Sequence, residues 1–206
     1  CGRAGAILNE PTASRPPGRA LKIAFIGSHG VGKTTLCYAL AARLKARDVA
    51  LDVIHEVARR CPMPINQETG VVSESWILHS QIADELLACW RYPVVICDRS
   101  ALDNYVYLLV AAGPQPNLET LVDGWMATYD LLVHVPIGGE PSADGVRAVD
   151  PVFQRVIDER LEAELAARGF SSLRLVAGER TNWVDRVEEA VLSRLGPRQL
   201  LLGDVK

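Results

Sequence analysis

The chain has 206 residues, 49% of them hydrophobic and 23% charged, which are the proportions of a globular domain and exclude a wholly disordered protein. A formal net charge of −3 argues against a main role in coating nucleic acid or an anionic membrane, and no apolar run approaches the roughly 18 residues of a membrane span. The cysteines are odd in number and widely spaced, so we expect reduced thiols in a cytoplasmic protein and no disulfide framework or zinc site: Cys1, Cys37, Cys61, Cys89 and Cys97.

The sequence predicts an N-terminal arm, one folded domain and a short tail. Residues 1–20 are rich in proline, glycine and arginine, which indicates a flexible arm; residues 21–195 form the domain and residues 196–206 the tail. Short aliphatic runs predict strands at 21–26, 50–54, 93–97, 131–135 and 173–176, and longer patterns predict helices at 33–47, 74–91, 101–111, 118–128, 151–168 and 183–195. This alternation predicts an α/β fold, with a parallel sheet of about five strands and helices on both faces.

Two of the predicted helices carry start signals. Ser73 is placed to cap the second helix, and Asp150 followed by Pro151 pairs an N-cap with the residue favoured at the first helical position. We therefore expect these two helices to begin at residues 74 and 151.

A phosphate-binding motif follows the first predicted strand. Residues 27–34, GSHGVGKT, match GxxxxGK[ST] at every fixed position and open a helix; we call them the phosphate loop. The glycines let successive backbone N–H groups turn inward around phosphates, and the helix N-terminus favours negative charge. Lys33 neutralises the β- and γ-phosphates, and the Thr34 hydroxyl is a hard oxygen ligand for Mg²⁺. The motif predicts ATP and Mg²⁺ binding by Ser28, His29, Gly30, Val31, Gly32, Lys33, Thr34 and Thr35.

Glu56 follows the second predicted strand, so we expect it at the same edge of the sheet as the phosphate loop. A carboxylate there can take the proton of an acceptor hydroxyl while a phosphoryl group transfers to it. We therefore predict that Glu56 is a catalytic base; the alternative is a solvated loop glutamate. The neighbouring His55 is interpreted as a packed or surface histidine.

Asp98 and Arg99 come at the end of the third predicted strand, at the edge where ligands bind in open α/β sheets. Asp98 could hold Mg²⁺ through water or orient the acceptor, and Arg99 could pair with a phosphate or a carboxylate. The alternative for Asp98 is an ordinary strand-end acid that caps the helix at Ser100–Ala101.

Residues 137–160 combine a glycine- and proline-containing loop with several arginines, the composition of a closing lid. Arginines on a lid can meet the charge that phosphoryl transfer spreads over oxygen atoms. Arg147 is the first candidate and Arg155 the second, with a solvated loop arginine as the alternative for Arg147. Arg160 is interpreted as a helix-surface residue that pairs with Glu164.

These motifs together resemble those of the nucleoside and nucleotide kinases among the P-loop proteins, in particular deoxynucleoside kinases, thymidylate kinases and nicotinamide-riboside-kinase-like domains. The resemblance covers about Leu21 to Leu195. It implies a single-domain P-loop NTPase fold with a lid, and transfer of the γ-phosphate of ATP to a nucleoside- or nucleotide-like acceptor.

Carried over to this sequence, the resemblance implies that Glu56 is the base on a substrate hydroxyl and that Arg147 and Arg155 are lid arginines. Asp98, Arg99 and Ser100 would lie near the magnesium and the substrate. Deoxynucleoside kinases follow the glutamate with proline, whereas Val57 follows it here, so the subfamily stays open. The segment 177–180 resembles the loop that touches adenine in such kinases, which implies that Arg180 binds the nucleotide.

In deoxynucleoside kinases a glutamine on a later helix reads the base, and Gln81 occupies a comparable stretch. Helical spacing, however, puts Gln81 on the polar side of the helix with Asp84 and Glu85, so surface exposure is the alternative. The same spacing predicts one apolar face made of Trp76, Ala83, Leu87 and Trp90.

Two functions remain open from the sequence. The first is a small-molecule kinase, which would rest on Lys33, Glu56, Asp98, Arg99, Arg147 and Arg155. The second is a P-loop ATPase or GTPase module whose hydrolysis drives a conformational switch or partner binding. A GTPase is expected to carry Asn-Lys-x-Asp, a string this sequence lacks, and the lid favours a kinase. The expected partner is a nucleoside-like acceptor, with no nucleic acid, no membrane and a homodimer as an open option.

Overall fold

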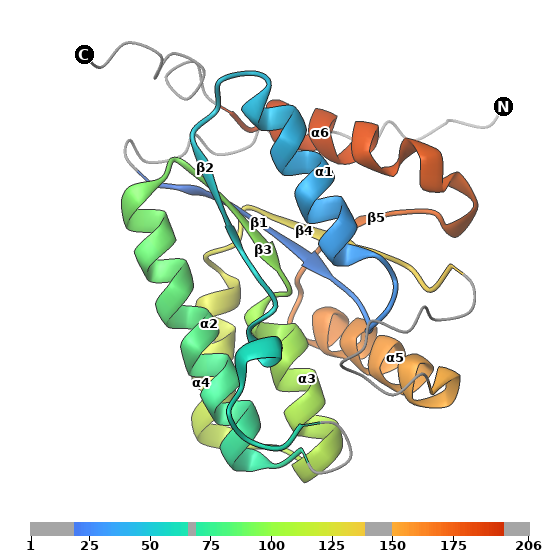
Figure 1. Ribbon diagram of the computed structural model, residues 1–206. Coiled ribbons are helices and arrows are strands. Elements are labelled where there is room, and N and C mark those ends of the chain that lie inside the picture. The colour runs from blue at the N-terminus through green and yellow to red at the C-terminus, as the bar shows by residue number, and fades with distance from the viewer. Residues whose placement is uncertain (1–18, 66–68, 139–149, 196–206) are drawn as a thin grey trace, which may run out of the picture.

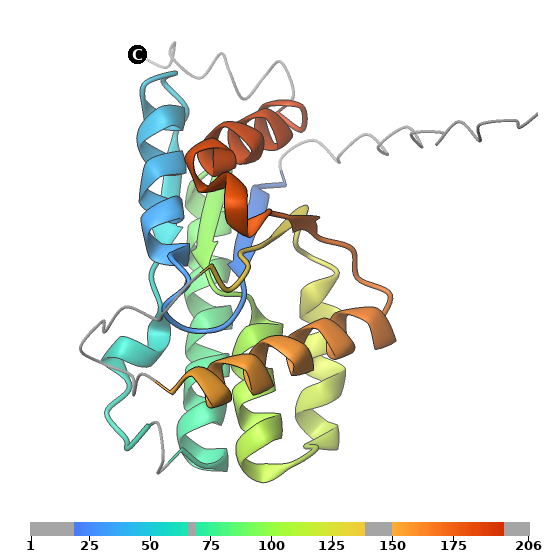
Figure 2. The same cartoon turned by 90° about the vertical axis from the view of Figure 1, so that its right-hand side faces the viewer.

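A computed structural model describes residues 19–65, 69–138 and 150–195. These residues form three layers, with a parallel sheet between two sets of helices (Figures 1 and 2). The five strands lie in the order β2-β3-β1-β4-β5. Their bounds are β1 Leu21–Ile26, β2 Leu51–Ile54, β3 Val94–Asp98, β4 Leu131–His134 and β5 Leu173–Arg174. The predicted α/β fold is confirmed.

The helices divide between the two faces of the sheet. One face is covered by α1 (Lys33–Lys45) and α6 (Trp183–Leu192). The other is covered by α2 (Val71–Arg91), α3 (Ala101–Ala112), α4 (Pro116–Met126) and α5 (Pro151–Ala167) (Figure 1). Two short 3-10 helices, η1 (Val57–Arg60) and η3 (Ala177–Asn182), follow β2 and β5.

The central strand β1 contributes to both cores. Phe25 and Ile23 pack toward α1 and α6, while Ala24 and Ile26 pack toward α3. All four side chains are fully buried, because β1 pairs with β3 on one side and with β4 on the other. This double burial explains the continuous aliphatic character of the strand.

One of the two predicted helix starts is confirmed and the other is wrong. The Asp150 side chain accepts hydrogen bonds from the backbone N–H groups of Val152 (2.8 Å) and Phe153 (3.3 Å), as an N-cap does. The other helix, α2, begins at Val71 after the N-cap Gly70. Ser73 lies inside its first turn, where its hydroxyl accepts a hydrogen bond from Gly70 N at 3.1 Å.

The predicted apolar face of α2 is also wrong. Trp90 is 88% exposed and Leu87 50% exposed, whereas Gln81 and Glu85 are fully buried. The physical reason lies in β1, where Lys22 points toward α2 and donates to Glu85 at 2.7 Å. A buried lysine needs a buried carboxylate, so the polar side of the helix faces the sheet.

Several predictions concern residues outside the described ranges: 1–18 of the predicted arm 1–20, 139–149 of the predicted lid 137–160, with Arg147, and the tail 196–206. The arm was predicted two residues too long, because Arg19 is described and Ala20 is buried in the core. The four described cysteines form no disulfide: Cys37 and Cys97 are buried, and Cys61 and Cys89 are partly buried. None of the helices in the described part of the chain is long and apolar enough to cross a membrane.

Candidate active site

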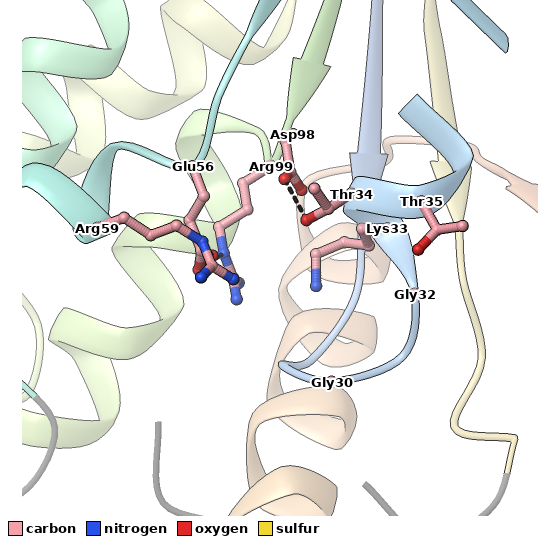
Figure 3. A pocket seen from close by; sticks show the side chains of 9 residues that line it. All are labelled: Gly30, Gly32, Lys33, Thr34, Thr35, Glu56, Arg59, Asp98 and Arg99. Atoms are coloured by element: carbon pink, nitrogen blue, oxygen red, sulfur yellow. Dashed lines mark hydrogen bonds and ion pairs between the residues drawn. The ribbon is translucent and has the colours of Figure 1, made fainter. Parts of the chain in front are cut away.

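The predicted site segments meet at one edge of the sheet. The phosphate loop follows β1, Glu56 follows β2, and Asp98 ends β3, so all three lie at the carboxyl ends of parallel strands (Figure 3). A pocket of about 360 Å³ opens there. Its lining residues are Gly30, Gly32, Lys33, Thr34, Thr35, Glu56, Arg59, Asp98 and Arg99. This edge is where open α/β sheets bind ligands.

Two glycines permit the backbone course of the phosphate loop. Gly27 has φ +134°, and a Cβ there would lie 2.6 Å from the carbonyl oxygen of Val135 in the chain after β4. Gly32 has φ +97° and is the last residue before α1. Side chains are strained at both positions, so the loop requires glycine where the motif has it.

Lys33 is held inside the phosphate loop. Its Nζ donates to the carbonyl oxygens of Gly27 (2.9 Å) and Ser28 (2.5 Å), and the side chain is buried. The Lys33 pKa is lowered from 10.5 to about 8, chiefly because burial disfavours the charged form and also because the positive charge of Arg99 lies nearby. An anion bound in the loop would stabilise this poorly solvated ammonium group.

Thr34 and Asp98 provide hard oxygen atoms at the mouth of the loop. The Thr34 hydroxyl donates to Asp98 Oδ2 at 2.5 Å. Hydroxyl and carboxylate oxygens are the ligands that Mg²⁺ prefers, so this donor set fits the ion. The alternative role for Asp98, a cap on the following helix, is wrong because Ser100 caps α3, its Oγ accepting from Asp103 N at 3.2 Å.

Glu56 faces the phosphate loop from the opposite side of the pocket (Figure 3). Its two carboxylate oxygens lie between two arginines, at 2.8 Å from Arg99 Nε and at 3.0 Å from Arg59 Nε. Glu56 is 7% exposed, so the alternative of a solvated loop glutamate is wrong. Sequence reasoning missed Arg59, although its place three residues after Glu56, in η1, was a signal for a local ion pair.

Arg99 is a buried cation with an unusual backbone. Its φ is +94°, a conformation that L side chains rarely adopt. Burial alone lowers the Arg99 pKa, but the surrounding Tyr107, Glu56, Asp103 and Asp98 raise it well above its usual value, so Arg99 stays charged. Among the described residues, Arg99 Nη1 has no hydrogen-bond partner, which leaves a donor for an anion.

Sequence reasoning missed two residues that hold the phosphate loop from outside. Asp103 Oδ1 accepts a hydrogen bond from Gly27 N at 3.0 Å, and Gln154 Nε2 donates to the carbonyl oxygen of His29 at 2.7 Å. Ser100 followed by Asp103 is a helix-capping pattern that could have drawn attention to Asp103. The sequence around Gln154 carries no such signal.

The remaining residues that the sequence singled out lie at the rim of the pocket or away from it. Arg155 is exposed on α5 and does not line the pocket. Arg180 lies beside the phosphate loop, since a Cβ on Gly32 would be 3.1 Å from Arg180 Nη2. The Arg160–Glu164 pair is confirmed at 2.8 Å, and His55 is a surface histidine as interpreted.

Gln81, for which surface exposure was the alternative, is instead buried beneath the site. Its Nε2 donates to Glu85 (2.8 Å) and to the carbonyl oxygen of Arg99 (3.2 Å). These contacts support the backbone of Arg99 and connect the site to the buried Lys22–Glu85 pair.

Comparison with solved structures shows the fold of P-loop kinases. Deoxyadenosine kinase from M. mycoides, solved with the product dCMP and a flexible dCDP bound, superposes with a TM-score of 0.61 at 13% identity, over 84% of this chain and 100% of that one. NadR, solved in complex with NAD and AMP-PNP, superposes with a TM-score of 0.64 at 21% identity, over 86% of this chain but 51% of NadR. This chain therefore spans about half the length of NadR.

Sequence comparison gives a family assignment. A search against curated proteins finds no match. A family model described as an AAA domain matches residues 22–186, from β1 into α6, and so includes the phosphate loop, Glu56, Asp98 and Arg99. Because the match extends over most of the chain and over every strand of the sheet, this protein belongs to that family of AAA domains.

Proposed function

We propose that this protein is an ATP-dependent small-molecule kinase that transfers the γ-phosphate of ATP to a nucleoside- or nucleotide-like acceptor. The observation that carries the proposal is Glu56, buried between Arg59 and Arg99 across the pocket from Lys33. Hydrolysis of ATP needs a positioned water at this place and no second substrate. A buried carboxylate with two guanidinium groups, in contrast, is suited to bind and orient a second substrate.

Each group in the pocket has a role in this proposal. The phosphate loop and Lys33 bind the triphosphate, and Arg180 beside Gly32 lies on the nucleotide side. Thr34 and Asp98 would hold Mg²⁺, which supplies neutralising charge to the phosphates. Glu56 takes the proton of the acceptor hydroxyl. Arg99, whose Nη1 makes no hydrogen bond among the described residues and lies 4.0 Å from Asp103 Oδ1, would stabilise the transferring phosphoryl group. Arg147 and Arg155 would join it from the predicted lid.

The structural neighbours support an acceptor that resembles a nucleoside. One is named a deoxyadenosine kinase and was solved with dCMP, and NadR was also solved with NR. The net charge of −3 and the cysteine spacing support a cytoplasmic protein with no nucleic-acid or membrane partner, and a homodimer stays an open option.

A second candidate is an ATPase module whose hydrolysis drives a conformational switch or the binding of a partner. Membership of an AAA-domain family favours it. The two functions differ in what stimulates ATP turnover: a small acceptor in the first, a macromolecular partner in the second.

Turnover of ATP in the presence of an acceptor panel tests the proposal. The protein is incubated with Mg²⁺ and ATP, with and without nucleosides, nucleotides and vitamins, and both ADP and phosphorylated acceptor are measured. We expect one acceptor class to stimulate ADP formation with equal formation of its phosphate ester. Turnover that no acceptor stimulates, but that a protein partner does, would favour the ATPase module.

The variant Glu56→Gln tests the proposed base. Glutamine keeps the size of the side chain but cannot accept a proton, so we expect kcat to fall about 100-fold or more while ATP affinity changes little. Arg60→Gln is the matched control, because Arg60 lies in the same 3-10 helix and pairs with Asp84, outside the pocket. If Glu56→Gln turns over at the parent rate, the base is elsewhere, with Asp98 the next candidate.

A further inference from the structure

The phosphate loop is held on its outer side by a side chain from α5. Gln154 Nε2 donates to the carbonyl oxygen of His29 at 2.7 Å, across 125 residues of sequence. Gln154 is 2% exposed, so no water competes for this hydrogen bond. Figure 3 shows α5, in pale orange, running directly past the loop near Gly30.

A hydrogen bond on the outer side of the phosphate loop matters because the loop binds phosphates with its backbone. Its N–H groups turn inward toward the ligand, and any carbonyl group that points away from the ligand needs a donor of its own. Lys33 now satisfies the carbonyl oxygens of Gly27 and Ser28. If Lys33 turns to the phosphates of a bound nucleotide, those two hydrogen bonds are lost. The Gln154–His29 hydrogen bond lies on the other side of the loop and does not compete with the ligand.

The first turn of α5 is itself fixed at this place. Asp150 caps the helix through the N–H groups of Val152 and Phe153. The Phe153 ring lies 5.9 Å from the His29 ring and 6.1 Å from the Tyr107 ring of α3, centroid to centroid. These contacts hold Gln154 opposite His29, so that little rotational freedom is lost when its hydrogen bond forms.

We propose that Gln154 is a positioning residue that preorganises the phosphate loop for the triphosphate of the nucleotide. The inference rests on the nucleotide binding included in the proposed function, but not on the transfer reaction. Loss of the Gln154 amide removes this buried hydrogen bond between α5 and the loop, and so weakens the support of the binding conformation. Affinity for the phosphates should therefore fall, while the acceptor side of the pocket is unchanged.

The test compares Gln154→Met with Gln115→Met. Methionine has nearly the length of glutamine but no amide. Gln115 is the matched control, because its Nε2 also donates to backbone carbonyls, those of Ala112 (3.4 Å) and Gly113 (3.3 Å), in the turn between α3 and α4, far from the loop in sequence. The Kd of Mg²⁺–AMP-PNP and that of inorganic tripolyphosphate are measured by calorimetry, and kcat and both KM values are measured with an accepted substrate.

For Gln154→Met we expect both Kd values and the KM for ATP to rise about 5- to 10-fold, the effect of one buried hydrogen bond. The KM for the acceptor and kcat at saturating ATP should change less than about 3-fold. Gln115→Met should bind both probes like the parent. A merely structural role of Gln154 would lower the melting temperature of Gln154→Met and leave its two Kd values unchanged.

If Gln154→Met binds both probes with Kd values within 2-fold of those of the parent protein, the inference is overturned. If this variant does not fold, Gln154→Leu removes the amide donor without adding a charge near the phosphates, and the same rise in Kd is expected. Failure of the proposed function gives a different result. A parent that binds AMP-PNP but phosphorylates no acceptor contradicts the kinase and leaves the role of Gln154 supported by its own variants.

Discussion

Lys33 carries its charge where water cannot solvate it, and this gives the protein a pH-dependent stability. Its pKa is about 8 in the folded chain against 10.5 for an exposed lysine, because burial disfavours the charged form. Between these two pH values the unfolded chain binds more protons than the folded chain. The free energy of unfolding must therefore rise with pH across this window, and the destabilising contribution of Lys33 is fully present below pH 8.

The variant Lys33→Met measures this contribution, because methionine has no proton to lose. A difference of about 2.5 pKa units corresponds to about 3 kcal/mol. We expect the unfolding free energy of the parent to rise by about that amount relative to Lys33→Met between pH 7 and pH 10.5. Urea denaturation at several pH values gives both free energies. A difference between the two proteins that stays flat over this range would show that the Lys33 pKa is not lowered.

Some residues of the site could be predicted from the sequence and others could not. Lys33, Thr34 and Glu56 could be found because a fixed motif or the end of a strand marks each of them. Gln154 could not, since its role depends on a contact between α5 and a loop 125 residues earlier. Arg59 was missed, and only the structure shows that it shares the Glu56 carboxylate with Arg99.

Among the elements, α2 and β1 are joined by a buried ion pair. Glu85 on α2 accepts hydrogen bonds from Lys22 Nζ (2.7 Å), Trp125 Nε1 (2.7 Å) and Tyr129 Oη (2.6 Å). Lys22 also lies over the Trp125 and Tyr129 rings, at 4.3 Å and 4.1 Å from their centroids. This cluster decides which face of α2 packs on the sheet.

Removing one charge of the Lys22–Glu85 pair should lower the free energy of unfolding more than removing both charges. Lys22→Met leaves the buried Glu85 carboxylate without a cation, which costs about 3–5 kcal/mol of unfolding free energy. The double variant Lys22→Met/Glu85→Gln removes both charges and keeps an acceptor for Trp125 and Tyr129, so we expect less than half of that loss. Equilibrium urea unfolding checks this order. A double variant less stable than Lys22→Met would contradict the ion-pair account.

The same cluster explains why strands were predicted better than the orientation of a helix. A parallel strand buried on both faces is a short aliphatic run that little else resembles, so β1 is found at its predicted bounds, Leu21–Ile26. The face that α2 buries was inferred from apolar spacing. That inference fails here because the buried face is partly polar, and its partner Lys22 lies about 60 residues earlier in another element.

For the whole molecule, the strand order brings the site together. The chain leaves β1, crosses over β3 to form β2, returns to β3, and then continues to β4 on the other side of β1. This order brings the phosphate loop, Glu56 and Asp98 to one edge of the sheet. Gly27, the first residue of the loop, and Asp98 meet there although they are 71 positions apart in the sequence. The order of helices and strands along the chain could be predicted from the alternating pattern. The order of strands within the sheet could not, because nothing in an aliphatic strand sequence specifies which strand it pairs with.

Every role argued for this edge depends on the phosphate loop binding a nucleoside triphosphate. The most direct test is a calorimetric titration of the folded protein with ATP in the presence of Mg²⁺, with Lys33→Ala titrated in parallel. We expect ATP to bind saturably at one site per chain. Lys33→Ala should bind ATP at least 10-fold more weakly, because a charge-assisted contact is removed. If the folded parent binds no purine nucleoside triphosphate under these conditions, the account is contradicted.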